Sequence, residues 1–338
     1  MPTPSVNEVS VPYTGPDAPA VVRTGEDRFS GLPGFPFQPH YVEVDNPHTA
    51  GGLRMHYVDE GPRDAPVVLM LHGEPAWSYL YRKMIPVFVA AGLRAIAPDH
   101  IGFGRSDKLT WPPHYSFEHH VAWLRQLAAT LDLRDITLVC QDWGGPISLA
   151  VLARETHRFS RVVAGNTMLH TAGPELAGRL TWAAHASGEE NSTVSTLLLE
   201  WMRQSQRTAE FRASDFLHFA TVRGVPPDQA AAWDAPFPSE WHKAGMRQFP
   251  LLIPVTRSDP GAVINQETWR ALEKFENPFL TLFGDSDPAT QGWETIFQER
   301  VPGARGQPHQ LLERAGHFWQ EDCGEQAAQI ITAWIGAG

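Results

Sequence analysis

The chain has 338 residues, of which 42% are hydrophobic and 19% charged, and it carries 27 basic against 38 acidic side chains for a net charge of −11. The apolar fraction is ample for a packed core and excludes wholesale disorder, and the acidic balance disfavours a nucleic-acid-binding protein, which needs a basic face. No run of about 18 apolar residues occurs, so neither a membrane-spanning helix nor a membrane partner is expected.

Residues 1–28 are predicted to form a loosely ordered leader, because prolines block regular structure there. The segment lacks a basic stretch followed by an apolar one, so it does not resemble a secretory signal. The two cysteines, Cys140 and Cys323, fit no metal-binding spacing and form no disulfide framework. This cysteine usage suits a reducing compartment, and we predict a cytoplasmic location without a bound metal.

Strands and helices alternate through the first half of the chain. In order, we predict strands at 41–44, 53–58 and 67–71, a helix at 79–90 interrupted by Pro86, a strand at 94–99, a helix from Phe117 to Leu131 capped by Ser116, a strand at 136–140, a helix at 146–153 and a strand at 162–165. The later strands are short, continuous apolar runs, which is typical of buried parallel strands. Strands that alternate with helices in this way indicate a mostly parallel sheet.

The alternation stops between residues 167 and 249, where only helices are expected, at 196–205, 214–222 and 228–233. Strand character returns at 278–284 and 310–312, and a final helix is predicted at 325–335. The chain is therefore predicted to be an α/β protein whose sheet is interrupted by a helical insertion. We place the first part of the sheet domain at 29–166, the helical cap at 167–250 and the second part of the sheet domain at 251–338.

The sharpest chemical signal is Asp142, at the point where a buried strand passes into a helix. Small residues stand two positions before it and two after it, at Cys140 and Gly144. This is the pattern of a nucleophile elbow, in which small neighbours let a strained turn project a nucleophile above the sheet. A carboxylate at that position can attack carbon directly and form an ester. Alternatively, an Asp at the end of a strand caps the following helix.

Two further segments support the interpretation of Asp142 as a nucleophile. The acids Asp285 and Asp287 follow a late strand, and His317 follows the next one. Nucleophile, acid and histidine in this order are typical of the α/β-hydrolase fold, in which the acid orients the histidine. In that fold the backbone N–H groups of Glu74, in the loop after the first buried strand, and of Trp143 would form an oxyanion hole.

Three segments, residues 71–86, 97–108 and 141–145, resemble the haloalkane dehalogenases of the α/β-hydrolase superfamily. The sequence His-Gly-Glu-Pro at 72–75 is similar to the subfamily typified by the 1,2-dichloroethane-degrading enzyme. A weaker likeness extends from about Arg28 to the C-terminus and leaves the leader uncovered.

The resemblance implies a hydrolytic dehalogenation without metal or cofactor. Asp142 would displace the halide in an SN2 step to give an alkyl-enzyme ester, and His317 would activate a water molecule that hydrolyses it. Asp287 would orient His317, because the family pattern is Gly-x-x-Asp and Gly284 precedes it by three positions; Asp285 is the alternative. The partners would be a small neutral halogenated alkane and the halide ion product, and the sequence contains no signal for an oligomeric state.

The resemblance also implies a halide site made of two indoles. Trp143 would supply one N–H, because an indole is a donor without a competing acceptor. Many relatives have Asn in place of Glu74 and donate from it, which an ionised Glu cannot do. The subfamily with Glu uses a cap tryptophan instead. Trp201 is predicted for this role and Trp182 is the second choice among the tryptophans of the insertion: Trp182, Trp201, Trp233 and Trp241.

Other hydrolases with the same elbow are disfavoured. An epoxide hydrolase would use cap tyrosines, and none of the six tyrosines lies in the insertion: Tyr13, Tyr41, Tyr57, Tyr79, Tyr81 and Tyr115. A fluoroacetate-type dehalogenase would have Arg, not Trp143, after the nucleophile, and a serine esterase would need Ser or Cys at position 142. A non-catalytic ligand-binding homologue is a distant alternative, because nucleophile, histidine and acid are all present.

Overall fold

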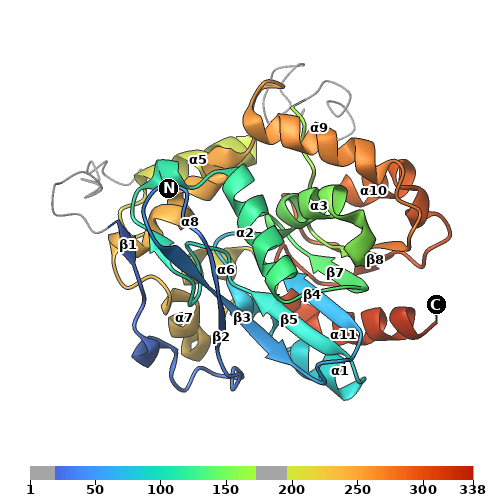
Figure 1. Ribbon diagram of the computed structural model, residues 1–338, viewed down its shortest axis with the longest axis horizontal. Helices are drawn as coiled ribbons and strands as arrows, with labels where there is room; N and C mark the ends of the chain where they lie inside the picture. The colour runs from blue at the N-terminus through green and yellow to red at the C-terminus, as the bar shows by residue number, and fades with distance from the viewer. Residues whose placement is uncertain (1–19, 173–195, 338) are drawn as a thin grey trace.

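A central eight-stranded sheet organises the protein, whose structure is a computed structural model that describes residues 20–172 and 196–337 (Figure 1). The strand order is β10-β9-β8-β7-β4-β5-β3-β2. Strands β10 to β5 pair in parallel, whereas β3 pairs antiparallel with β5 and with β2, so the predicted mostly parallel sheet is confirmed. The strands are β2 (His40–Asp45), β3 (Gly52–Glu60), β4 (Val67–Leu71), β5 (Arg94–Pro98), β7 (Ile136–Cys140), β8 (Phe159–Ala164), β9 (Phe279–Gly284) and β10 (Gln310–Leu312).

Helices cover both faces of this sheet. Strands β4, β5 and β7 are buried along their whole length, which requires an apolar layer on each side. On one side α2 (Phe117–Thr130), α3 (Gly144–Arg154) and α9 (Pro260–Leu272) pack together; on the other, α1 (Ile85–Ala90) packs with α11 (Trp319–Gly336) (Figure 1). Helix α10 (Trp293–Arg300) packs beside β9.

Local capping rules explain where several helices begin. The Oγ of Ser116 accepts a hydrogen bond from the N–H of His119 at 3.1 Å and caps α2, as predicted. The helix predicted at 79–90 is divided into a 3-10 turn at Ser78–Tyr81 and α1, because Pro86 lacks an N–H and starts a helix rather than continuing one. Helix α11 begins at Trp319, earlier than predicted, and is kinked at Cys323. Helices α9 and α10 were not predicted.

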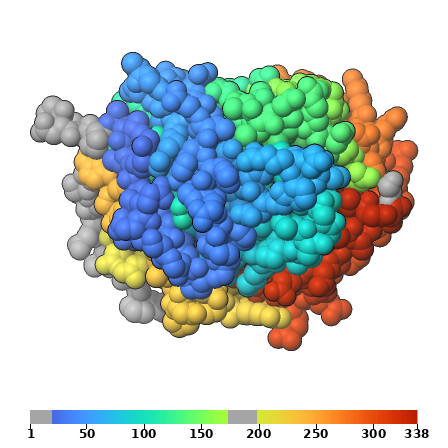
Figure 2. Space-filling view, turned by 60° about the horizontal axis from the view of Figure 1, so that its bottom comes forward, coloured from blue at the N-terminus to red at the C-terminus, as the bar shows by residue number. Residues whose placement is uncertain are grey.

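The described residues before β2 pack on the sheet domain. Strand β1 (Val21–Val22) pairs antiparallel with β6 (Lys108–Leu109), and Nε of Arg23 donates to Oδ1 of Asp107 at 2.7 Å. In Figure 2 the blue N-terminal part of the chain covers a broad area of one face, with the red C-terminal part at the other end. The last residues of the predicted leader are therefore paired to the core from Ala20 onward.

A helical insertion follows β8, as predicted, and its described part reaches over the carboxyl edge of the sheet. It contains α5 (Thr196–Arg207), α6 (Ala213–Phe219), α7 (Pro227–Asp234) and α8 (Ala244–Gln248). Phe249, just after α8, packs edge-on against Phe103 and Trp143 of the sheet domain at ring-centroid distances of 4.9 and 5.4 Å. These aromatic contacts join the insertion to the sheet domain. No helix within the described ranges is long and apolar enough to cross a membrane.

Candidate active site

Asp142 occupies the tip of a sharp turn between β7 and α3. Its φ is +49°, a left-handed conformation that Asp tolerates better than most side chains and that costs about 1–3 kcal/mol. The N–H of Gly144 donates to the carbonyl of Gln141 at 2.9 Å, and the N–H of Gly145 donates to that of Asp142 at 3.0 Å. A Cβ on Gly144 would collide with the carbonyl of Leu71, so only glycine fits. The predicted elbow is present in the geometry.

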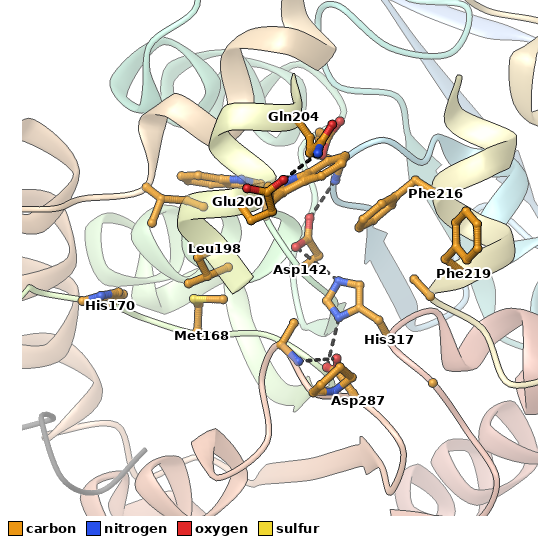
Figure 3. Close-up of a pocket in the computed structure, with 18 of the residues that line it drawn as sticks. Asp142, Met168, His170, Leu198, Glu200, Gln204, Phe216, Phe219, Asp287 and His317 are labelled. Carbon is orange, nitrogen blue, oxygen red and sulfur yellow. Dashed lines mark hydrogen bonds and ion pairs between the residues drawn. The ribbon is translucent and has the colours of Figure 1, made fainter. Parts of the chain in front are cut away.

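Asp142, His317 and Asp287 form one chain of contacts (Figure 3). Nε2 of His317 lies 3.3 Å from Oδ2 of Asp142, and Nδ1 of His317 lies 3.0 Å from Oδ2 of Asp287. His317 stands in the loop between β10 and α11, and Asp287 follows β9, so the parallel strands bring all three residues to one edge of the sheet. The imidazole therefore bridges the two carboxylates.

The two candidate acids have different surroundings. Asp287 is 3% exposed and accepts hydrogen bonds from the hydroxyl of Thr290 and, at 2.9 Å, from the N–H of Ala289. Asp285 is exposed and instead accepts from the N–H groups of Arg314 and Ala315, at 3.0 and 3.3 Å. Of the two acids, Asp287 is therefore the one beside His317, and Asp285 ties down the loop that precedes it.

The charge of His317 is set by opposing effects. Burial alone would lower the pKa of this imidazole, but the charge of Asp287, the contact of Nε2 with Asp142 and the hydrogen bond that Nδ1 donates to Asp287 raise that pKa to about 10. Burial works against ionisation of Asp287, and the imidazolium outweighs it, so the pKa of Asp287 is lowered. In the resting protein His317 is thus an imidazolium held between two carboxylates at neutral pH.

We expect this imidazolium to stabilise the fold over a defined pH window. The pKa of His317 is raised from 6.5 to about 10 on folding, so the native state holds the proton more tightly. The free energy of unfolding should therefore decrease as pH rises from 6.5 to about 10, and His317→Gln should remove this decrease. Urea denaturation of both proteins across the window measures the difference. Parallel pH dependences for the two proteins would contradict the expectation.

The loop after β4 delivers a donor to Asp142. The backbone N–H of Glu74 donates to Oδ1 of Asp142 at 2.7 Å, and a Cβ on Gly73 would overlap the Asp142 carboxylate. His72 shapes the loop: its Nε2 accepts from the N–H of His100 at 3.1 Å, so its Nδ1 carries the proton and donates to the carbonyl of Gly73 at 2.8 Å. The Glu74 N–H is where an oxyanion-hole donor was predicted.

These groups open into a largely apolar cavity of about 350 Å³, which α5 and α6 help to enclose. In Figure 3, Phe216 and Phe219 lie on one side of Asp142, and Leu198 and Met168 on the other. Among the described residues that line it there is no Lys, Arg or Tyr. The described lining is Glu74, Asp142, Trp143, Pro146, Met168, His170, Leu198, Glu200, Trp201, Gln204, Phe216, Phe219, Ala220, Thr221, Val222, Ile253, Pro254, Asn265, Ser286, Asp287, Pro288, Ala289, Gly316 and His317.

Two of the predicted tryptophans line this cavity, Trp143 and Trp201. Trp201 stacks on Phe216 at a centroid distance of 4.1 Å. Trp233 is fully buried away from the cavity and packs edge-on against Tyr79. The second choice, Trp182, lies outside the described residues.

Asn166, which was not predicted as a site residue, holds the elbow and the histidine loop together. Its side-chain amide donates to the carbonyls of Gly316 and His317 at 2.7 and 3.0 Å and accepts from the N–H of Gly284 at 2.7 Å. Its own carbonyl accepts from the N–H of Asp142 at 2.9 Å. The available signal was a polar residue two positions after the end of β8, at the same sheet edge as the other site residues.

Comparisons with known proteins agree with this geometry. A family model described as alpha/beta hydrolase fold matches residues 66–295. A haloalkane dehalogenase of Psychrobacter cryohalolentis is 45% identical over 93% of this chain and 98% of its own length, and one of Mycobacterium marinum is 43% identical over 93% and 99%. The solved tetrameric structure of a haloalkane dehalogenase from Paraglaciecola agarilytica superposes with a TM-score of 0.79 at 34% identity, covering 92% of this chain and 97% of that one.

The elbow with an aspartate, the histidine between two carboxylates and the long matches to these enzymes lead to one conclusion. The chain belongs to the haloalkane dehalogenases, hydrolases of the α/β-hydrolase fold that act on carbon–halide bonds.

Proposed function

We propose that Asp142, His317 and Asp287 carry out the hydrolytic dehalogenation of small neutral haloalkanes in this chain. The observation that supports this assignment is the contact chain from Asp142 through His317 to Asp287, at an apolar cavity that two indoles also line. The backbone N–H of Glu74 holds the Asp142 carboxylate in place, and the apolar walls keep water away from that carboxylate during the first step.

In the first step a carboxylate oxygen of Asp142 attacks the carbon that carries the halogen. The carbon–halogen bond breaks as the new carbon–oxygen bond forms, and the bonding electrons leave with the halide. The indole N–H groups of Trp143 and Trp201 stabilise the departing anion, which is bound more strongly in a dry pocket than in water. The products of this step are the alkyl ester of Asp142 and a halide ion.

In the second step His317 acts as the base. Alkylation removes the negative charge of Asp142, which is one of the groups that raise the pKa of His317, so the imidazole releases its proton more easily. The neutral Nε2 then takes a proton from water, and the hydroxide adds to the ester carbonyl, whose oxygen is stabilised by the backbone N–H groups of Glu74 and Trp143. Collapse of this intermediate breaks the bond between the carbonyl carbon and the alkoxy oxygen, and the His317 imidazolium gives its proton to the leaving alkoxide to form the alcohol. The carboxylic acid left at Asp142 then returns a proton to His317, which restores the carboxylate and the imidazolium, while Asp287 holds the imidazole in its tautomer.

The charges at the cavity favour neutral substrates. Asp142, Glu74 and Asp287 contribute carboxyl groups to the lining, and no described lining residue is a Lys or Arg that could pair with a substrate carboxylate. An additional carboxylate on the substrate would therefore be buried without a partner, which costs several kcal/mol. We propose haloalkanes rather than haloacids as the substrate class.

A halide-release assay tests the function. Short bromo- and chloroalkanes should release halide and yield the alcohol, with bromides faster than chlorides because the carbon–bromine bond is weaker. Styrene oxide tests the epoxide-hydrolase alternative, and the matching haloacid tests the substrate class. Turnover of styrene oxide without halide release from any haloalkane would refute the proposal.

The two-indole halide site predicts unequal effects of two tryptophan substitutions. Trp201→Phe should lower kcat/KM and weaken bromide binding by about 10- to 100-fold, because it removes one hydrogen bond to an anion. Trp233 is a fully buried ring that does not line the cavity. Trp233→Phe should therefore lower the melting temperature and leave the bromide affinity within about threefold of the wild-type value. Steady-state kinetics and fluorescence titration measure both; equal effects would refute the assignment of Trp201.

Three coarser expectations are proposed alongside the chemistry. The cap spans about residues 167–250, between core segments 29–166 and 251–338. The chain belongs to the subfamily that has Glu in the loop after β4 and a halide site of two indoles. Its location is cytoplasmic. What supports the cap limits is the run of helices α5 to α8 before α9, which packs with α2 and α3 of the sheet domain.

A further inference from the structure

The side chain of Asp322 connects the cap to the loop that carries His317. Asp322 lies in the first turn of α11 and is buried. Its Oδ2 accepts hydrogen bonds from the N–H of Gly316 at 2.9 Å and from the N–H of Val222 at 3.0 Å, and its Oδ1 accepts from the N–H of Arg223 at 3.0 Å. A buried carboxylate needs such donors, and hydrogen bonds to an ionised acceptor are about twice as strong as neutral ones. One side chain of the sheet domain therefore holds both segments.

The two segments that Asp322 joins both belong to the wall of the cavity. Gly316 directly precedes His317, and both residues line the cavity. Val222 belongs to the connection between α6 and α7, of which residues 220–222 also line the cavity. The hydrogen bonds of Asp322 therefore act on the part of the wall that includes the imidazole.

The backbones of these two segments are in direct contact. A Cβ on Gly316 would lie 2.6 Å from the carbonyl oxygen of Ala220, so a larger residue there would push the segments apart. The N–H of Phe318 donates to the same carbonyl at 3.4 Å, and the Phe318 ring packs edge-on against Phe216 of α6 at a centroid distance of 5.8 Å. The cap thus contacts the residues on both sides of His317, and a displacement of the cap has to move the loop.

The loop is held from two directions. Asn166 binds the carbonyls of Gly316 and His317 from the side of the sheet, whereas Asp322 binds the N–H of Gly316 and links it to the cap. The Nε2 atom of His317 lies 3.3 Å from Oδ2 of Asp142 in this arrangement. A misplacement of about 1 Å can cost a reacting group about 10²-fold in rate, so the hydrolysis step is sensitive to the position of this loop.

We propose that Asp322 is a positioning residue for His317: by fastening the cap segment 220–223 to Gly316, it holds the imidazole where it activates water. The inference rests on the function proposed above and adds a residue to it. Asp322 is not among the described residues that line the cavity, so it acts through the loop rather than on the substrate. Ester formation uses the Asp142 carboxylate and the halide donors, whereas ester hydrolysis uses His317 as the base. Loss of Asp322 therefore slows the hydrolysis of the ester more than its formation.

Rapid-quench kinetics with a short bromoalkane separate the two steps, because bromide release reports ester formation and the mass of the peptide that contains Asp142 reports ester decay. In Asp322→Ala the ester should decay about tenfold or more slowly than in the wild type, while the first equivalent of bromide should appear within about threefold of the wild-type rate. Asp322→Asn keeps one oxygen, which at the position of Oδ2 accepts the N–H groups of both Val222 and Gly316. Its ester should decay within about threefold of the wild-type rate.

Asp234→Ala is the matched control. The Oδ1 of Asp234, in α7, accepts from the N–H of Ser214 at 3.1 Å, and its Oδ2 accepts from the Ser214 hydroxyl at 2.6 Å. These hydrogen bonds lie within the cap and do not reach the loop of His317. D234A should lower the melting temperature and leave the rates of both steps within about threefold. A merely structural role of Asp322 would give D322A and D234A the same kinetics.

Amide hydrogen exchange connects the kinetics to the hydrogen bonds and needs no turnover. The amides of Val222 and Gly316 lie outside helices and strands, and in the wild type both should be protected at least about tenfold, because one buried carboxylate accepts both. Ester decay should be slow only in a variant that loses this protection. The wild type and D322N keep the test decisive if D322A fails to fold.

The outcomes separate this inference from the function on which it rests. Unprotected amides at Val222 or Gly316 in the wild type, ester decay in D322A within threefold of the wild type, equal slowing of both steps in D322A, the same kinetics in D234A, or slow ester decay in D322N with both amides protected would each overturn the role of Asp322. In all these cases wild-type halide release from bromoalkanes would stand unaffected. Absence of wild-type halide release would instead overturn the proposed function.

Discussion

His317→Gln is expected to stop the enzyme after one turnover and leave the alkyl group on Asp142. The first step uses only the carboxylate and the halide donors, so a reactive bromoalkane should release about one equivalent of bromide per protein. The second step needs a base, and glutamine supplies none at neutral pH. Steady-state turnover should fall by about 10⁴-fold or more, as in other triads that lose a member. Mass spectrometry of the peptide that contains Asp142 should show the alkyl adduct.

The contacts of His317 identify a matched control for this experiment. His170 also lines the cavity, but it is not part of the contact chain with Asp142. His170→Gln should turn over continuously and leave no adduct at the end of the reaction. Unmodified Asp142 in H317Q after incubation with a reactive bromoalkane would contradict the covalent mechanism, whatever the residual rate.

Asp142→Asn is expected to abolish the release of even the first equivalent of bromide. The amide keeps the shape of the side chain and can accept the N–H of Glu74, but it is a poor nucleophile. Halide release should fall by on the order of 10⁶-fold, the loss typical of removing a nucleophile that acts as part of a triad. Rapid-mixing assays should show no burst, and the peptide should carry no adduct.

Folding and halide binding should survive in D142N. The substitution removes one of the two carboxylates that raise the pKa of His317, so the free energy of unfolding should depend less on pH between 6.5 and about 10 than that of the wild type. Bromide should bind at least as tightly as in the wild type, because a negative charge beside the anion is removed.

Asp285→Asn is the matched control. Asp285 accepts hydrogen bonds from the backbone of Arg314 and Ala315, and its substitution should change turnover by less than about threefold. Appreciable bromide release by D142N would refute the role of Asp142.

Local sequence rules were sufficient for the sheet and the elbow. Continuous apolar runs identified β4, β5, β7, β8 and β9, because strands buried on both faces have no polar side. Such runs gave little information on α9 and α10, because the positions of these helices depend on packing against other elements. The turn at Asp142 was recognisable because the requirement for small neighbours is imposed by the chain next to it.

The choice between near neighbours depended on distant contacts. Asp285 and Asp287 are two positions apart and chemically equal, and the family pattern favoured Asp287. Only the folded chain shows that one reaches His317 while the other bonds to the loop before it. The four candidate tryptophans posed the same problem, because helical spacing does not say which face of a cap helix meets the cavity.

Burial changes the acidity of the Glu74 side chain. From sequence it is an acid that cannot donate a hydrogen bond to a halide when it is ionised. In the structure burial and the charge of the neighbouring Asp142 raise the pKa of its carboxyl group well above the ordinary value. Asn166 was likewise invisible as a site residue, because its three side-chain hydrogen bonds join segments more than 100 residues away in sequence.

The sequence by itself determined the fold class, the elbow carboxylate and the order of nucleophile, acid and histidine, since these follow from neighbouring residues and their spacing along the chain. The tertiary structure decided which acid meets the imidazole, which indoles line the cavity and which carboxyl group is buried there. Those properties depend on distance and on removal from water, and both are set only when remote segments pack together.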